Sequence, residues 1–127
     1  MPVRVVLIED NDVFREALEL LLGIRPGIEV VGSRPDGSDA VELCRELRPD
    51  VLVVDYRLPG PDGVEITRSV RRHCPEVAVV ALTAAAGESE LRALREAGAV
   101  ACLRKDDPLD AIADAVRAAA VSGDPID

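Results

Sequence analysis

The stretch Val51-Leu-Val-Val-Asp-Tyr-Arg-Leu-Pro-Gly60 joins four apolar residues to a carboxylate. A strand that is apolar on both faces is typical of the middle of a parallel sheet covered by helices on both sides. Asp55 stands at the end of this strand, and Pro59 and Gly60 indicate a loop behind it. A charged group beside a buried strand needs a compensating partner, so Asp55 is the first candidate functional residue.

Similar apolar runs recur along the chain, beginning near Val3, Ile28, Val51, Val77 and Ala99. Each of the first four is followed by apolar residues at helical spacing, in the first case Phe14, Leu18, Leu21 and Leu22. We expect these helices to end at Gly23, Pro49, Pro75 and Gly98, and a fifth helix to end near Gly123. The alternation predicts an α/β fold with a five-stranded, doubly wound parallel sheet, (βα)5.

The composition favours one folded domain. The 127 residues are 48% hydrophobic and 31% charged, and we expect a single domain over 1–121 with a tail or linker start at 122–127. The formal charge of −9 argues against nucleic-acid binding by this domain itself. The opening residues do not resemble a signal peptide, and no apolar run is long enough to span a membrane, so we expect a cytoplasmic location.

Polar residues follow four of the five predicted strands. Glu9 and Asp10 follow the first strand, Asp55 ends the third, Thr83 follows the fourth, and Lys105 follows the fifth. In open α/β sheets, ligands bind outside the carboxyl ends of the strands, where the strand order reverses. If the order is 2-1-3-4-5, the three carboxylates converge beside that point.

Three neighbouring carboxylates repel one another, by about 4 kcal/mol for a pair ~4 Å apart at an effective dielectric near 20. A divalent cation with oxygen ligands compensates such a cluster, and Mg²⁺ is the expected ion. Lys105, the chain's only lysine, is a second counter-charge. The sequence lacks the glycine-rich nucleotide loops and the Gly-x-Ser-x-Gly elbow, which argues against nucleotide binding and serine-histidine catalysis. The remaining groups are a metal ion, the carboxylates, one hydroxyl and one ammonium, and together they indicate a site that binds or transfers a phosphoryl group.

Four motifs in order resemble the response-regulator receiver domain of two-component signalling, over essentially the whole chain. They are Glu9-Asp10, the segment from Val53 through Asp55 to Gly63, Ala81-Leu-Thr83-Ala, and Ala97-Gly-Ala99 with Leu103-Arg-Lys105. The details are most similar to receivers of the LuxR/NarL type. The resemblance implies a flavodoxin-like sheet with order 2-1-3-4-5.

The resemblance also implies roles for the polar residues. Asp55 would be the phosphoacceptor, and Asp10, helped by Glu9, would hold Mg²⁺ together with Asp55 and the backbone carbonyl of Arg57. Thr83 and Lys105 would contact the phosphoryl oxygens. The donor would be a sensor histidine kinase, and the protein would be a signalling domain rather than an enzyme with its own substrate.

Phosphorylation would switch the surface of the fourth helix, fifth strand and fifth helix. That surface would control an output, and the resemblance also allows homodimerisation through it. The output expected is transcription through a helix-turn-helix domain outside this chain. The chain would then be an excised piece of a longer regulator.

The sequence departs from the receiver pattern at Cys102, where the family usually has an aromatic residue, and at Asp106, where proline is more usual. The acidic pair, Glu9-Asp10, is also Glu-Asp rather than Asp-Asp. Cys102 is the one support for an alternative function, a pseudo-receiver that binds a partner without phosphorylation. A metal-dependent phosphatase is disfavoured, since no Asp-x-Asp motif provides a nucleophile and a general acid.

Simpler interpretations of the same residues also stand. Asp55 would cap a turn, Glu9 and Asp10 would cap the first helix, Thr83 would cap the fourth helix, and Lys105 would be a solvated surface residue. For Cys102 the favoured interpretation is a small buried hydrophobe.

Overall fold

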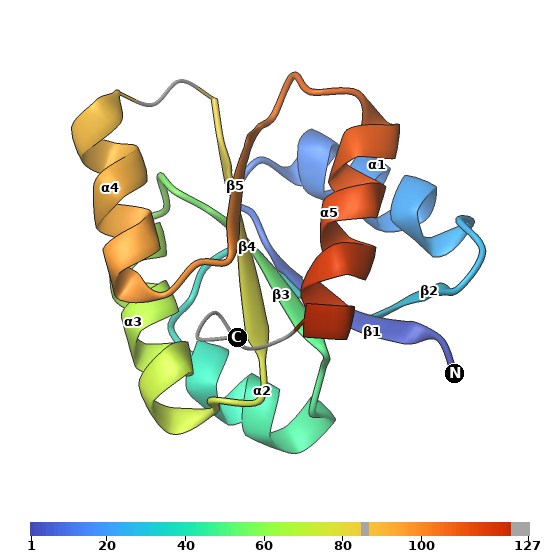
Figure 1. The fold of residues 1–127 in the computed structure, drawn as a ribbon, viewed down its shortest axis with the longest axis horizontal. Helices are drawn as coiled ribbons and strands as arrows, with labels where there is room; N and C mark the ends of the chain where they lie inside the picture. Colours follow the sequence, from blue (N-terminus) through green and yellow to red (C-terminus); the bar gives the residue numbers. More distant parts are fainter. Residues whose placement is uncertain (85–86, 123–127) are drawn as a thin grey trace.

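The computed structural model describes residues 1–84 and 87–122 and contains five strands that alternate with five helices (Figure 1). The elements are β1 (Val3–Ile8), α1 (Asp12–Gly23), β2 (Ile28–Arg34), α2 (Ala40–Leu47), β3 (Val51–Asp55), α3 (Gly63–His73), β4 (Ala78–Thr83), α4 (Glu88–Ala97), β5 (Ala101–Arg104) and α5 (Leu109–Ser122). The strands form one parallel sheet in the order β2-β1-β3-β4-β5. The predicted fold class and strand order are confirmed.

The sheet separates two hydrophobic layers. Side chains alternate across it, so that in β3 Leu52 and Val54 face α2, α3 and α4, while Val51 and Val53 face α1 and α5. All five residues of β3 are buried, because β3 lies at the centre of the sheet with helices on both sides. The strand that ends at Asp55 is therefore held on every side.

The helix ends follow from the residues predicted to end them. Helix α1 ends at Gly23, α3 ends shortly before Pro75, and α4 is followed by Gly98 with a φ of 116°. Helix α2 ends before Pro49, with Arg48 in the left-handed region at a φ of 50°. The predicted tail lies outside the described residues from 123 onward, although α5 reaches Ser122.

One prediction for α1 is wrong. Leu18 and Leu22 are buried as expected, but Leu21 is 40% exposed. The outer side of the helix also carries apolar residues, with Val13 and Leu20 exposed, so apolar spacing alone does not identify the inner face.

No helix within the described residues is both long and apolar enough to cross a membrane.

Candidate functional site

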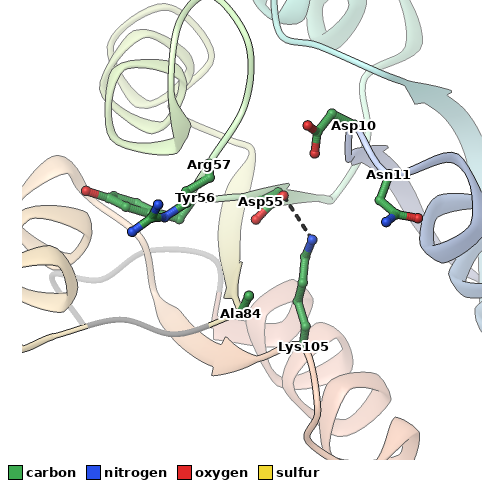
Figure 2. Close-up of a pocket in the computed structure, with 7 residues that line it drawn as sticks. All are labelled: Asp10, Asn11, Asp55, Tyr56, Arg57, Ala84 and Lys105. Atoms are coloured by element: carbon green, nitrogen blue, oxygen red, sulfur yellow. Dashed lines mark hydrogen bonds and ion pairs between the residues drawn. The ribbon is translucent and has the colours of Figure 1, made fainter.

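The polar residues predicted at the strand ends meet at one edge of the sheet. Glu9 and Asp10 follow β1, Asp55 and Thr83 are the last residues of β3 and β4, and Lys105 follows β5. A pocket of about 450 Å³ lies at this edge, and Figure 2 shows the residues that line it: Asp10, Asn11, Asp55, Tyr56, Arg57, Ala84 and Lys105. Parallel strands bring their carboxyl ends together, which places residues 50 positions apart side by side.

Three carboxylates form a cluster in this site. One oxygen each from Glu9, Asp10 and Asp55 lies within 4.8 Å of the others. Glu9 and Asp55 are 3% and 5% exposed, whereas Asp10 is exposed to solvent. Within residues 1–84 and 87–122, no hydrogen bond or ion pair to the Asp10 side chain is found.

Lys105 compensates the two buried carboxylates. Its Nζ lies 2.7 Å from Glu9 Oε1 and 3.0 Å from Asp55 Oδ2, and it donates a hydrogen bond to the latter (Figure 2). The backbone N–H of Lys105 donates to the carbonyl of Thr83 at 2.7 Å, which fixes the start of the side chain beside the end of β4. Lys105 is thus an internal counter-ion and not a solvated surface lysine, so that simpler interpretation is wrong.

Burial and charge act against each other in the pKa values of this group. Burial raises the pKa of Glu9 above its usual value, although the close Lys105 ammonium and the hydrogen bond from the N–H of Asn11 oppose the shift. Burial alone would lower the pKa of Lys105, but the interactions with the Glu9 and Asp55 carboxylates outweigh burial and the pKa is raised. Lys105 is therefore held in its charged form at neutral pH.

The donor set fits a hard divalent cation. Glu9 Oε1 is buried, and although it pairs with Lys105 by distance, its contact lacks hydrogen-bond geometry, so this oxygen has no hydrogen-bond partner among the described residues. Carboxylate oxygens are preferred ligands of Mg²⁺, and Asp10 provides an open, solvent-facing ligand that leaves room for bound water. The cluster can therefore hold a metal ion.

The loop after Asp55 is held close to the end of β3 by Gly63. A β-carbon at this position would lie 2.6 Å from the Asp55 carbonyl oxygen and 2.8 Å from the Tyr56 Cα. The N–H of Gly63 donates to the Tyr56 carbonyl, and Asp62 forms a capping box with Glu65 at the start of α3. The first turn of α3 thereby fixes the loop.

Arg57 lines the pocket from this loop, and Figure 2 shows its side chain pointing away from Asp55. The predicted use of its backbone carbonyl as a metal ligand stays a prediction.

Two simple capping interpretations are wrong. The N-cap of α1 is Asn11, whose Oδ1 accepts from the N–H of Phe14, and the N-cap of α4 is Gly87. Thr83 belongs to β4 and is 2% exposed, although it does not line the pocket. The contribution of Asn11 was missed, even though asparagine before a helical run is a recognisable cap signal.

Asp55 caps no turn among the described residues, since the hydrogen bond found to its side chain comes from Lys105.

Two of the residues that depart from the receiver pattern, Cys102 and Asp106, lie close to Lys105 in the sequence. Cys102 is half-buried on the edge strand β5, so the expectation of a buried position is only partly met, and burial raises the pKa of its thiol. Asp106 pairs with Arg104 on the surface at 2.9 Å. Neither residue enters the pocket.

Phe14 is a further neighbour that the sequence did not single out. Lys105 Nζ lies 4.9 Å from the centroid of its ring. The contact joins the first turn of α1 to the residue after β5, so no local sequence pattern predicts it.

Comparisons with known proteins agree on one family. Residues 5–117 match the model of the response regulator receiver domain. The chain is 38% identical to the transcriptional regulatory protein LiaR of Bacillus subtilis over 97% of this chain and 58% of LiaR, and 32% identical to the nitrate/nitrite response regulator protein NarP of Escherichia coli over 94% and 55%. The chain spans about half the length of the curated relatives it matches.

Solved structures show the same similarity. The signal receiver domain of the response regulator NarL from Mycobacterium tuberculosis matches with a TM-score of 0.90 and 33% identity, over 94% of this chain and 97% of that one. A two-component response regulator of the LuxR family from Aurantimonas matches with a TM-score of 0.90 and 31% identity, over 96% and 87%.

Proposed function

The chain belongs to the response regulator receiver domain family, and on that premise we propose that Asp55 accepts a phosphoryl group in a Mg²⁺-dependent reaction. The observation that carries the proposal is the carboxylate at the end of β3, 5% exposed yet open to the pocket, beside Lys105 and two further carboxylates. The donor proposed is the phosphohistidine of a sensor histidine kinase.

The reaction is a displacement at phosphorus. An oxygen of Asp55 forms a bond to phosphorus while the bond from phosphorus to the donor breaks, and the donor leaves with the electron pair of that bond. The rigid central strand holds the Asp55 oxygen at a fixed place, which lowers the entropic part of the barrier.

Each neighbour of Asp55 contributes through charge or hydrogen bonding. Glu9, Asp10, Asp55 and the carbonyl of Arg57 would hold Mg²⁺, which when bound supplies positive charge against the phosphoryl oxygens. Lys105 would pair with those oxygens, and the Thr83 hydroxyl would donate to one of them. Asp10 would break no contact with the protein in binding the ion, because its side chain has no partner in the described part of the chain.

The output proposed is the surface of α4, β5 and α5. Phosphorylation adds about −1 to −2 charges next to Thr83 and Lys105, whose backbones are joined by a hydrogen bond at the ends of β4 and β5. β5 is an edge strand, so a shift at its carboxyl end reaches the surface directly. We expect this surface to control transcription through a DNA-binding domain outside this chain, as the relatives named as transcriptional regulators suggest, and to serve as a dimer contact.

Intact mass spectrometry tests the proposal. Incubation with Mg²⁺ and a small acyl phosphate should add about 80 Da, and the gain should be absent in Asp55→Asn and when the metal is chelated. Asp62→Asn is a matched control, since Asp62 caps α3 from the same loop and should leave the gain intact.

If the unmodified protein gains no mass under these conditions, the phosphorylation proposal fails. The alternative is then a pseudo-receiver that acts by binding alone, for which Cys102 on β5 is the supporting observation. Multiple turnover of a phosphate ester would instead revive the phosphatase alternative.

A further inference from the structure

The Lys105 ammonium has an aromatic neighbour in addition to its two carboxylates. Its Nζ lies 4.9 Å from the centroid of the Phe14 ring, within the range of a cation–π interaction. Phe14 is the chain's single phenylalanine, and Tyr56 is its one other aromatic residue. The core is built almost entirely from aliphatic residues, so general aromatic packing does not account for a ring at this position.

The position of the Phe14 ring is fixed by the same loop that fixes Glu9. The N–H of Phe14 donates to Asn11 Oδ1 at 2.9 Å, and the N–H of Asn11 donates to Glu9 Oε2, also at 2.9 Å. The ring packs against the hydrophobic layer under α1 and α5. The ring and one of the two carboxylates that bind Lys105 are therefore held together as one unit.

An aromatic face holds an ammonium group differently from a carboxylate. An ammonium has three N–H donors, and Glu9 and Asp55 are close enough to engage two of them. The ring attracts the positive charge without neutralising it, whereas a further carboxylate would compete with Asp55. The Lys105 side chain is 19% exposed, so the attraction acts in a partly desolvated environment, where it is stronger than at the surface.

We propose that Phe14 is a positioning residue for the Lys105 ammonium, which it keeps beside Asp55 and available to phosphoryl oxygens. The role deepens the phosphoryl-transfer function proposed above and rests on it. The lysine stem is long and flexible, and the pocket beside it is open. Without the ring, the ammonium spends more time in solvent or near exposed Asp10, where it opposes metal binding.

Fluorination of the ring tests the proposal with almost no change in shape. Because the chain holds one phenylalanine, biosynthetic incorporation of mono-, di- and trifluorophenylalanine alters Phe14 alone. Each fluorine withdraws charge from the ring face and weakens its attraction for a cation. We expect the initial rate of phosphorylation by acetyl phosphate to fall stepwise, reaching about threefold to tenfold for the trifluoro ring.

Two side-chain variants complement the series. Phe14→Leu should slow phosphorylation by at least as much as trifluorination, and Phe14→Tyr, which keeps an electron-rich ring, should restore most of the rate. A rate independent of fluorination, or full activity in Phe14→Leu, overturns the proposal and leaves Phe14 a packing residue.

A second readout requires no phosphorylation. The single ¹⁹F resonance of 4-fluoro-Phe14 should shift in Lys105→Met and stay in place in Arg104→Met, an exposed neighbour paired with Asp106. An unchanged resonance in Lys105→Met refutes the contact itself. If the unlabelled protein is not phosphorylated at all but the resonance shifts, the phosphoacceptor function fails while the Phe14–Lys105 contact stands.

Discussion

Replacement of Lys105 by methionine is expected to destabilise the protein strongly when divalent metal is absent. The substitution keeps most of the apolar stem but removes the ammonium that lies 2.7 Å from Glu9 and 3.0 Å from Asp55. Loss of one partner from a buried ion pair costs about 3–5 kcal/mol, because the remaining charge is left uncompensated. Here two carboxylates lose their partner at once, at 4% and 6% side-chain exposure.

Two features reduce that cost. Lys105 is itself partly exposed, and its own desolvation is relieved by the substitution. We therefore expect a loss of about 2–4 kcal/mol at pH 7 in EDTA, or roughly 8–15 °C in melting temperature for a domain of this size. Mg²⁺ should restore more stability to Lys105→Met than it adds to the unmodified protein, since the ion and the ammonium compensate the same charge.

Urea unfolding followed by circular dichroism, with and without Mg²⁺, measures both effects. Arg104→Met is the matched control: it removes a neighbouring cation whose ion pair with Asp106 is exposed, and it should change the free energy of unfolding by at most about 0.5 kcal/mol. A Lys105→Met protein as stable as the unmodified one in EDTA would refute the picture of two buried, charged carboxylates.

Three further perturbations probe the loop, the acidic cluster and the cysteines. Gly63→Ala should lower the free energy of unfolding by about 1–3 kcal/mol in urea titration, because the added Cβ would meet the Asp55 carbonyl. Gly23→Ala is the control and should be close to neutral, because the space around Gly23 is open. Equal effects of the two substitutions would contradict the close approach at Gly63. Asp10→Ala should raise the melting temperature in EDTA by about 2–4 °C through lost repulsion and weaken Mg²⁺ binding in calorimetry; a lower melting temperature would argue against a crowded cluster. Iodoacetamide at pH 8 should modify half-buried Cys102 first, as measured by peptide mass spectrometry. Burial raises the pKa of Cys44 to about 12, so Cys44 should be modified only on unfolding. Early labelling of Cys44 would show that α2 opens locally.

The fold was predictable because its signals are local and repeated. Apolar runs such as 51–54 define the strands, and Gly98 and Pro75 stand where helices end. The convergence of Glu9, Asp10 and Asp55 was predictable once parallel strands were assumed, since all strand ends then share one edge. Here the sequence pattern and the topology carry the same information.

What the sequence did not reveal depends on distances between elements. Leu21 matches the inner face of α1 by spacing, but the helix is apolar on two sides and only packing decides which side is covered. The contact between Phe14 and Lys105 joins residues 91 positions apart, because the start of α1 and the residue after β5 both lie at the carboxyl edge of the sheet, so no periodicity indicates it. The pairing of Lys105 with Glu9 as well as Asp55 likewise appears only in three dimensions.

The site carries an excess of negative charge that one divalent cation would balance. Three carboxylates and one ammonium leave two negative charges uncompensated, which matches one divalent cation. Conversion of the Asp55 carboxylate to an acyl phosphate would replace one negative charge with about two, so the balance reached with the cation would be lost again. Lys105 and Thr83 are the groups proposed to respond, and because the backbone N–H of Lys105 donates to the carbonyl of Thr83, a movement of either one would be transmitted to the ends of both β4 and β5. A signal in this protein would thus arise from a charge imbalance at one buried carboxylate and leave through the edge strand of the sheet.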